Sequence, residues 1–124
     1  LHDALPIWMG LLDYRQQHPA SMSGGQKQRL CIAVACMKDT DVICFDEPTS
    51  GLDYSSMVNV SSLLHELAEQ GKTLLVTTHD YEFLMHTCTH ICYLLNGRVE
   101  SFFPVEPRYT PQIYSILFQK EVVL

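Results

Sequence analysis

The fold is decided by residues 42–53, whose sequence is VICFDEPTSGLD. Its first four residues are apolar without interruption, as in a strand that is buried on both faces of a sheet. Two acids, Asp46 and Glu47, then Pro48 end this strand, and a turn-rich stretch leads to Asp53. Aspartate is a favourable residue at a helix N-cap, so we expect a helix over residues 54–69.

The residues that follow predict a strand–helix–strand unit. Spaced apolar residues give the helix one buried face, and Gly71 suits its C-terminal cap. That face consists of Met57, Val60, Leu64, Leu67 and Ala68. Residues 73–77 (TLLVT) predict a second buried strand. Two strands joined by a helical crossover run parallel, so the sequence predicts an α/β fold.

Shorter elements flank this unit. Before it, we expect a helix over residues 9–17, a loop over 20–26 and a helix over 26–37 whose N-cap region includes Ser23. The second helix has apolar residues at helical spacing, namely Leu30, Ala33, Val34 and Met37. After the unit, we expect a helix near 81–88, a strand near 90–95, a hairpin turn at Asn96-Gly97, a strand over 98–103 and a short helix over 112–119.

Composition limits the class of protein. The chain has 124 residues, of which 47% are hydrophobic and 18% charged, as in one globular domain. The longest apolar run, residues 30–37, is far shorter than the roughly 18 residues of a membrane helix. A net charge of −6 argues against a nucleic-acid-binding face. Five cysteines without a secretory leader favour reduced thiols in the cytosol.

The carboxyl ends of the two predicted strands bring reactive side chains to one edge of the sheet. Asp46 and Glu47 end the first strand, and Thr78, His79 and Asp80 end the second. A carboxylate such as Asp46 suits Mg²⁺, and Glu47, which alternates to the other side, is available to deprotonate a water molecule. A histidine at this edge can donate a hydrogen bond to a phosphate oxygen.

Residues 23–25 (Ser-Gly-Gly) begin the helix that precedes the first strand. Backbone N–H groups at a helix start favour an anion. Together with the acids and the histidine, this arrangement indicates phosphoryl transfer.

Four motifs in this order and spacing resemble the ABC ATPases. Residues 23–29 (SGGQKQR) resemble the family's signature, with Met22 where leucine is commonest, and residues 42–50 resemble its Walker B strand. Residues 50–53 (SGLD) resemble the D-loop, and residues 78–80 (THD) resemble the switch-histidine motif. The resemblance covers residues 8–103, after a possible non-native or linker segment over 1–7 and before a carboxyl-terminal tail over 104–124. It implies a P-loop NTPase-like fold, a parallel sheet flanked by helices.

The resemblance also implies roles for individual residues. Asp46 would bind Mg²⁺ through water, Glu47 would be the general base, and His79 would contact the γ-phosphate. The signature residues Ser23, Gly24, Gly25 and Gln26 would close over ATP held by a second ABC ATPase subunit. Asp53 would couple the two sites of that head-to-tail dimer. A membrane-embedded transporter subunit would be the other partner, and the chain would work at the cytoplasmic face of the membrane.

One part of the family's machinery is not in these residues. The sequence holds no G-x-x-x-x-G-K-[ST], so we expect a partial domain that lacks the Walker A half. We therefore expect residues 1–124 alone to hydrolyse no ATP. Residues 53–57 and 78–83 resemble the corresponding segments of energy-coupling-factor importers. The alternatives are a soluble ABC ATPase acting on nucleic acid or ribosomes, and a truncated interaction module without catalysis.

Other residues receive structural interpretations. Lys27 and Arg29 are expected on a solvated helix face, and Cys31, Cys36 and Cys44 on buried faces. An alternating run of histidine and cysteine over residues 86–92 (HTCTHIC) fits no common zinc spacing.

Overall fold

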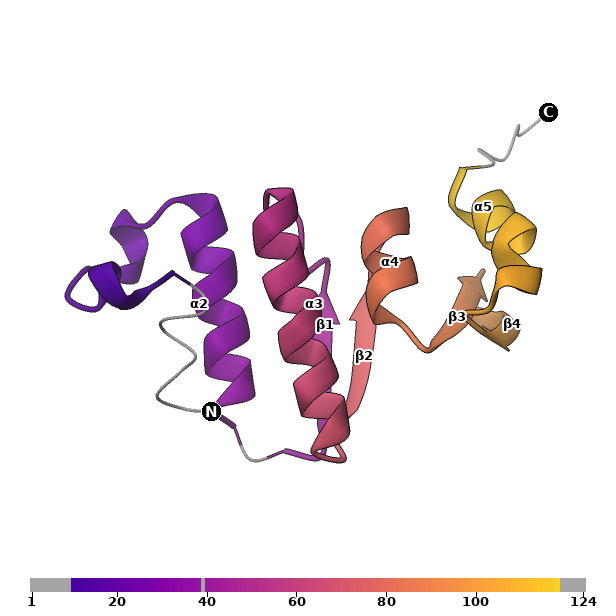
Figure 1. Ribbon diagram of the computed structural model, residues 1–124, viewed down its shortest axis with the longest axis horizontal. Coiled ribbons are helices and arrows are strands. Elements are labelled where there is room, and N and C mark those ends of the chain that lie inside the picture. Colours follow the sequence, from indigo (N-terminus) through magenta and orange to yellow (C-terminus); the bar gives the residue numbers. More distant parts are fainter. Residues whose placement is uncertain (1–9, 39, 119–124) are drawn as a thin grey trace. The chain divides into compact units, whose positions relative to one another are not determined.

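The computed structural model describes residues 10–38 and 40–118 (Figure 1). The chain divides into two units, residues 1–78 and residues 79–124, and each is described by itself. In the first, the 3-10 helices η1 (Leu12–Tyr14) and η2 (Pro19–Ser21) precede α2 (Gly24–Cys36), β1 (Val42–Asp46), α3 (Tyr54–Glu69) and β2 (Thr73–Thr77). The second contains α4 (Tyr81–Thr87), β3 (His90–Leu95), β4 (Arg98–Pro104), η3 (Pro107–Tyr109) and α5 (Thr110–Phe118).

The predicted strand–helix–strand unit is confirmed. β1 pairs with β2 in parallel, in a register that runs from Val42 opposite Thr73 to Asp46 opposite Thr77. The α3 helix begins after Asp53, as predicted, and the Asp53 carboxylate accepts a hydrogen bond from the Ser56 N–H at 2.7 Å. Gly71, with a φ of +87°, follows the end of α3 in the left-handed conformation of a C-terminal cap. The fold is α/β, as the sequence predicts.

The burial predicted for the two strands is wrong among the described residues. In β1, Ile43 and Phe45 are buried whereas Val42 and Cys44 are exposed, and in β2 the Leu75 side chain is 57% exposed. Alternate residues of β1 are therefore buried on one face, and α3 contacts the β1–β2 pair through β2. An uninterrupted apolar run does not reveal how many layers cover a sheet.

The helix predicted over residues 26–37 is confirmed as α2, but two of its four spaced apolar residues are exposed. Its buried residues are Ile32, Ala33 and Cys36, whereas Val34 and Met37 are exposed. Residues 29, 32, 33 and 36 form one helical stripe, and Arg29 at its start is charged. A search for apolar spacing alone therefore selects a neighbouring stripe. Cys31 on α2 and Ala68 on α3, both predicted on buried faces, are exposed.

The amino-terminal part of the described chain differs from the helix predicted over residues 9–17. Only the three residues of η1 are helical there, and no side chain caps η1 at Leu11. Met9 lies outside the described residues. His18 caps η2 by accepting the Ala20 N–H on its ring nitrogen Nδ1 at 3.1 Å. The His18 cap and Pro19 start a separate short turn, so this stretch is two 3-10 turns instead of one helix.

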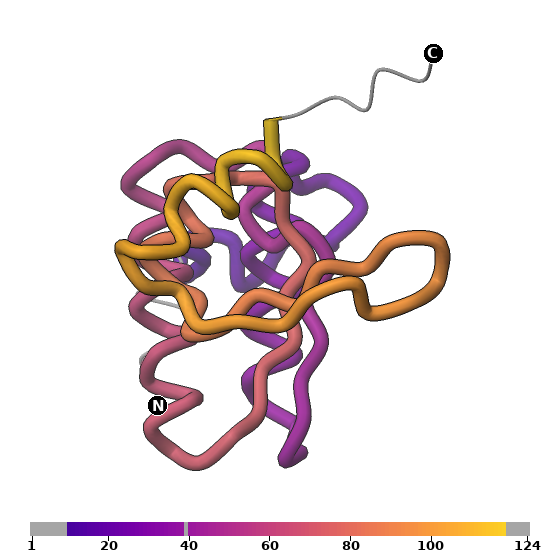
Figure 2. The backbone as a smooth tube through the Cα atoms, turned by 90° about the vertical axis from the view of Figure 1, so that its right-hand side faces the viewer, coloured from indigo at the N-terminus to yellow at the C-terminus, as the bar shows by residue number. Residues whose placement is uncertain are grey.

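The second unit is an antiparallel hairpin packed on helices (Figures 1 and 2). Asn96 and Gly97 form the predicted turn, with φ values of 50° and 75°, and the tip of the hairpin projects away from α5 (Figure 2). Leu84, Phe103 and Ile113 form the core of the unit. Phe103 comes from β4 and Ile113 from α5, so the helix predicted over 112–119 begins two residues earlier and packs on the hairpin.

No helix among the described residues is long and apolar enough to cross a membrane.

Candidate functional site

The acids at the end of β1 are held by the end of β2. Thr77 lies opposite Asp46 in the parallel register, and its hydroxyl donates a hydrogen bond to the Asp46 carboxylate. The backbone N–H of Glu47 donates to the Thr77 carbonyl oxygen at 3.0 Å and lies 3.1 Å from the Thr77 hydroxyl oxygen, which also accepts from it. One residue of β2 therefore contacts both acids that the sequence singles out.

Glu47 has a left-handed backbone, with a φ of +48°. This conformation costs a residue other than glycine roughly 1–2 kcal/mol. The surrounding structure maintains it from both sides, because Thr77 accepts the Glu47 N–H and the Gln28 side-chain amide donates to the Glu47 carbonyl oxygen at 3.0 Å. Gln28 belongs to α2, so the helix that begins with residues 24–26 is tied directly to the proposed base.

The start of α2 has the form expected of an anion site. Ser23 caps the helix, with the Gln26 N–H donating to the Ser23 hydroxyl oxygen at 3.3 Å and the Ser23 N–H donating to the Gln26 side-chain carbonyl at 2.9 Å. The N–H groups of Gly24 and Gly25 have no partner within a helix. The Ser23 hydroxyl keeps its proton for donation to an acceptor such as a phosphate oxygen.

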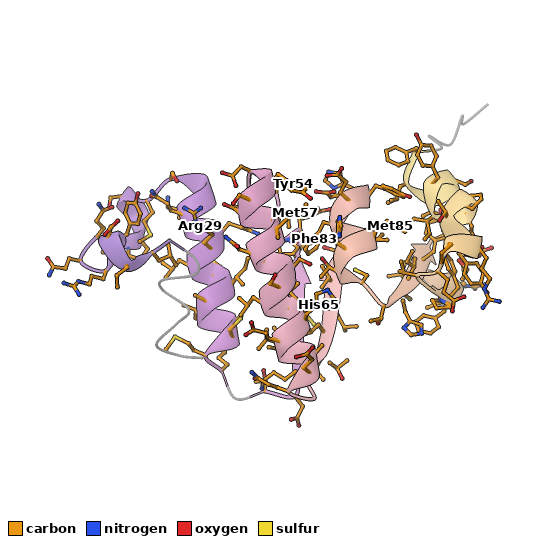
Figure 3. All side chains as sticks on the ribbon, viewed as in Figure 1. Arg29, Tyr54, Met57, His65, Phe83 and Met85 are labelled. Carbon is orange, nitrogen blue, oxygen red and sulfur yellow. The ribbon has the colours of Figure 1, made fainter. Side chains whose placement is uncertain are left out.

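Asp53 lies in a small polar network between α3 and α2. The Arg29 guanidinium on α2 donates to the Ser56 hydroxyl on α3 at 3.3 Å, and the Ser56 N–H donates to Asp53. Figure 3 labels Arg29 on α2 beside the first turns of α3, where Tyr54 and Met57 are labelled. The backbone hydrogen bond from Ser56, its side-chain hydrogen bond and the Arg29 charge together lower the pKa of Asp53.

The solvated position predicted for Arg29 is wrong. Its side chain is only partly exposed, and its Nε atom is buried without a hydrogen-bond partner within the part of the chain that the structure describes. Arg29 thus joins two helices instead of facing solvent.

The depressed pKa of Asp53 predicts a pH dependence of stability. A carboxyl whose pKa is lower in the folded state stabilises the fold above its ordinary pKa of 3.8, and this contribution is lost as the pH falls through the folded value. Asp53→Asn keeps an oxygen for the cap but removes the titration. When the pH falls from about 5 to about 3, the free energy of unfolding is expected to decrease more in the wild-type full protein than in Asp53→Asn. Urea unfolding measures this difference.

The matched control is Asp13→Asn, which removes one carboxylate within η1 instead of at a helix cap. Equal losses of stability in the wild type and Asp53→Asn would contradict the assignment.

The structure brings together some of the predicted site residues but does not relate all of them. Asp46, Glu47, Asp53 and the signature residues 23–26 belong to the first unit, and there Gln28, Arg29 and Thr77 connect their elements. His79 begins the second unit and is described with it. In that unit Asp80 caps α4 by accepting the Phe83 N–H at 3.1 Å, so this acid has a structural role.

Sequence reasoning missed three of the connecting residues, Gln28, Arg29 and Thr77. Thr77 had a signal, because a polar residue at the end of the second strand must lie opposite the first acid in a parallel pair. Arg29 had one as well, because it starts the stripe that continues with Ile32 and Ala33. No pattern in the sequence indicated the side-chain bond from Gln28 to a backbone carbonyl.

The residues at the end of β1 fit a magnesium ion. The Asp46 side chain is exposed, and one carboxylate oxygen is fixed by Thr77 while the other accepts no hydrogen bond from the described residues. Mg²⁺ binds through one or two carboxylates, keeps several water molecules and takes the remaining ligands from phosphates. Asp46 would hold the ion, which would supply charge neutralisation on the phosphate oxygens.

Comparisons with known proteins agree with this arrangement. The family described as ABC transporter matches residues 3–50. The histidine/lysine/arginine/ornithine transport ATP-binding protein HisP of Escherichia coli is 43% identical over 91 residues, which are 72% of this chain and 35% of HisP. The arginine transport ATP-binding protein ArtP of Escherichia coli is 38% identical over 89 residues, 72% of this chain and 37% of ArtP.

A solved structure is similar in both sequence and shape. The ATP-binding cassette MJ0796, in a dimeric post-hydrolysis state bound to ADP and Pi, is 32% identical with a TM-score of 0.71, over 82% of this chain and 44% of the cassette. The chain spans less than half the length of each of these three relatives. The chain belongs to the ABC transporter family of ATP-binding domains.

Proposed function

We propose that the protein carrying this chain is the ATP-binding and ATP-hydrolysing subunit of an ABC transporter, which couples hydrolysis to transport through a membrane subunit. The observation that carries the proposal is the junction in the first unit. There Asp46 and Glu47 end β1 beside β2, and Gln28 of the signature helix bonds to the Glu47 backbone. A metal carboxylate, a base and an anion-binding helix start on connected elements suit phosphoryl transfer.

Each residue has one step in this reaction. Glu47 accepts the proton of the attacking water, whose oxygen forms the new bond to the γ-phosphorus as the bond to the leaving ADP oxygen breaks. Asp46 would hold Mg²⁺, largely through water, and the ion would neutralise charge on the phosphate oxygens. His79 donates a hydrogen bond to a γ-phosphate oxygen and so orients the group. These roles come from the resemblance to the ABC ATPases.

The signature residues act on a second subunit. Ser23, Gly24, Gly25 and Gln26 would contact the γ-phosphate of ATP held by the partner in a head-to-tail dimer, and Asp53 would couple the two sites. The Arg29–Ser56 bond supports this coupling, because it joins the signature helix to the helix that Asp53 caps. The solved MJ0796 relative is itself dimeric.

The names of two relatives bear on the transported substrate and on the transporter subtype. HisP and ArtP are named for the transport of amino acids, arginine among them in both cases. Neither name indicates an energy-coupling-factor importer, so that subtype stays a prediction from residues 53–57 and 78–83. A membrane-embedded partner would place the protein at the cytoplasmic face of the membrane.

The test uses the full protein that contains these residues, expressed with and without a candidate membrane subunit. We expect ATP hydrolysis that requires Mg²⁺ and stops on chelation, and co-purification with the membrane subunit. Residues 1–124 alone are expected to hydrolyse no ATP. Stimulation of turnover by ribosomes or RNA would support the soluble ATPase instead, and absence of ATP binding in the full protein would support the non-catalytic interaction module.

A further inference from the structure

We propose that Thr77 is a positioning residue, which orients both the metal carboxylate Asp46 and the backbone of the base Glu47 through a single hydroxyl group. This inference rests on the proposed function of that site.

The hydroxyl of Thr77 uses both of its hydrogen-bonding capacities. Its proton goes to Asp46 Oδ1, and its oxygen accepts the N–H of Glu47 at 3.1 Å. A hydroxyl has only one proton. Because this proton is directed at Asp46, the lone pairs of the same oxygen are directed toward the Glu47 N–H. Asp46 ends β1 and Glu47 follows it in the chain, and Thr77 on the neighbouring strand connects the two acids through hydrogen bonds as well.

The bond to Asp46 restricts a side chain that is otherwise exposed. A carboxylate at the end of a strand rotates about two side-chain torsions, and a charge-assisted bond to one oxygen selects one orientation. The second oxygen then has a fixed direction for a metal-bound water. Loss of the hydroxyl is therefore expected to change the use of the metal more than the fold.

The backbone of Glu47 is held more than once. Besides the Thr77 hydroxyl, its N–H donates to the Thr77 carbonyl at 3.0 Å, and its carbonyl accepts from Gln28. Removal of the hydroxyl leaves these two bonds in place, so the left-handed turn at Glu47 is expected to persist. The measured change would then come mainly from Asp46.

The experiment compares Thr77→Val, Thr77→Ser and Thr73→Val in the full protein. Valine keeps the branched shape but removes the hydroxyl, and serine keeps the hydroxyl. Thr73 is a matched control, because it lies on the same strand and four residues before Thr77, so that both belong to the same face of the sheet. It lies opposite Val42, at the other end of the register. Thermal unfolding of each variant separates loss of folding from loss of positioning.

We expect Thr77→Val to raise the Mg²⁺ concentration for half-maximal ATP hydrolysis by about tenfold, with little change in the KM for ATP at saturating Mg²⁺. Thr77→Ser should restore most of the metal dependence, and Thr73→Val should match the wild type. An unchanged Mg²⁺ requirement in Thr77→Val, or equal defects in valine and serine variants, would overturn the proposal.

A second readout does not depend on turnover. Mn²⁺ binding in the presence of ATP, followed by electron paramagnetic resonance, should weaken about tenfold in Thr77→Val and not in Thr73→Val. A wild type that hydrolyses no ATP would contradict the proposed function, whereas equal Mn²⁺ affinities in the wild type and Thr77→Val would contradict the role of Thr77.

Discussion

Replacement of Glu47 by glutamine in the full protein is expected to lower ATP hydrolysis by about a hundredfold or more while ATP binding persists. Glutamine has the shape of glutamate, but its amide cannot accept the proton of the attacking water. The fold around this position should survive, because Thr77 and Gln28 bond to the Glu47 N–H and carbonyl, which glutamine keeps. The variant therefore separates proton transfer from architecture.

Two measurements follow the Glu47→Gln variant. Steady-state release of phosphate gives the turnover, and light scattering with and without ATP gives the mass of the assembly. Because hydrolysis would be blocked with ATP still bound, ATP-bound dimers should accumulate. The matched control is Glu69→Gln at the end of α3, an exposed glutamate outside the site, which should behave as wild type. Undiminished turnover in Glu47→Gln would remove Glu47 from the role of base.

The elements of the fold could largely be predicted from the sequence where local chemistry determines them. Asp53 and Gly71 delimit α3 because a carboxylate cap and a left-handed residue are local requirements. Asn96-Gly97 places the hairpin for the same reason. Burial could not be predicted as well. Cys44 and Leu75 are apolar in sequence yet exposed among the described residues, since coverage of a sheet face depends on elements distant in the sequence.

In the candidate site, too, residues with a local sequence signal could be predicted, and residues that act through distant partners could not. Asp46 and Glu47 stand out because two acids follow an apolar run, and Ser23 because it precedes a helix. The residues that hold them were missed, because their partners are far along the chain. Thr77 bonds to residues about thirty positions away and Gln28 to one nineteen away. Such contacts become visible only when the strand register and the placement of the helix are known.

Gly25→Ala is expected to make the protein more stable and less active. The backbone of Gly25 is helical, and an added Cβ would lie 3.6 Å from the Gly51 carbonyl oxygen and 3.7 Å from Leu52, which are ordinary contact distances. Alanine at a compatible position stabilises a protein by about 0.4–1 kcal/mol, because the unfolded chain has less freedom to lose. Packing among the described residues gives no reason for a glycine at this position.

The reason proposed for Gly25 is close approach of a phosphate. Its N–H is one of the unpaired donors at the start of α2, and a methyl group beside it would hold an anion away from the backbone. ATP turnover by the full protein should then fall about tenfold or more, because a displacement of about 1 Å at the reacting group is costly. Urea unfolding gives the stability, and phosphate release gives the turnover.

Gly71→Ala provides the opposite pattern and hence the control. Gly71 has a φ of +87°, so alanine there is strained and should lower stability, while turnover per folded molecule should stay at the wild-type level because Gly71 follows the far end of α3 from Asp53. A Gly25→Ala variant that gains stability and keeps full turnover would show that the backbone at Gly25 does not approach the nucleotide. If Gly25→Ala gains stability and loses turnover, misfolding cannot explain the loss. The result would show that glycine at position 25 is needed for ATP hydrolysis although it lowers stability.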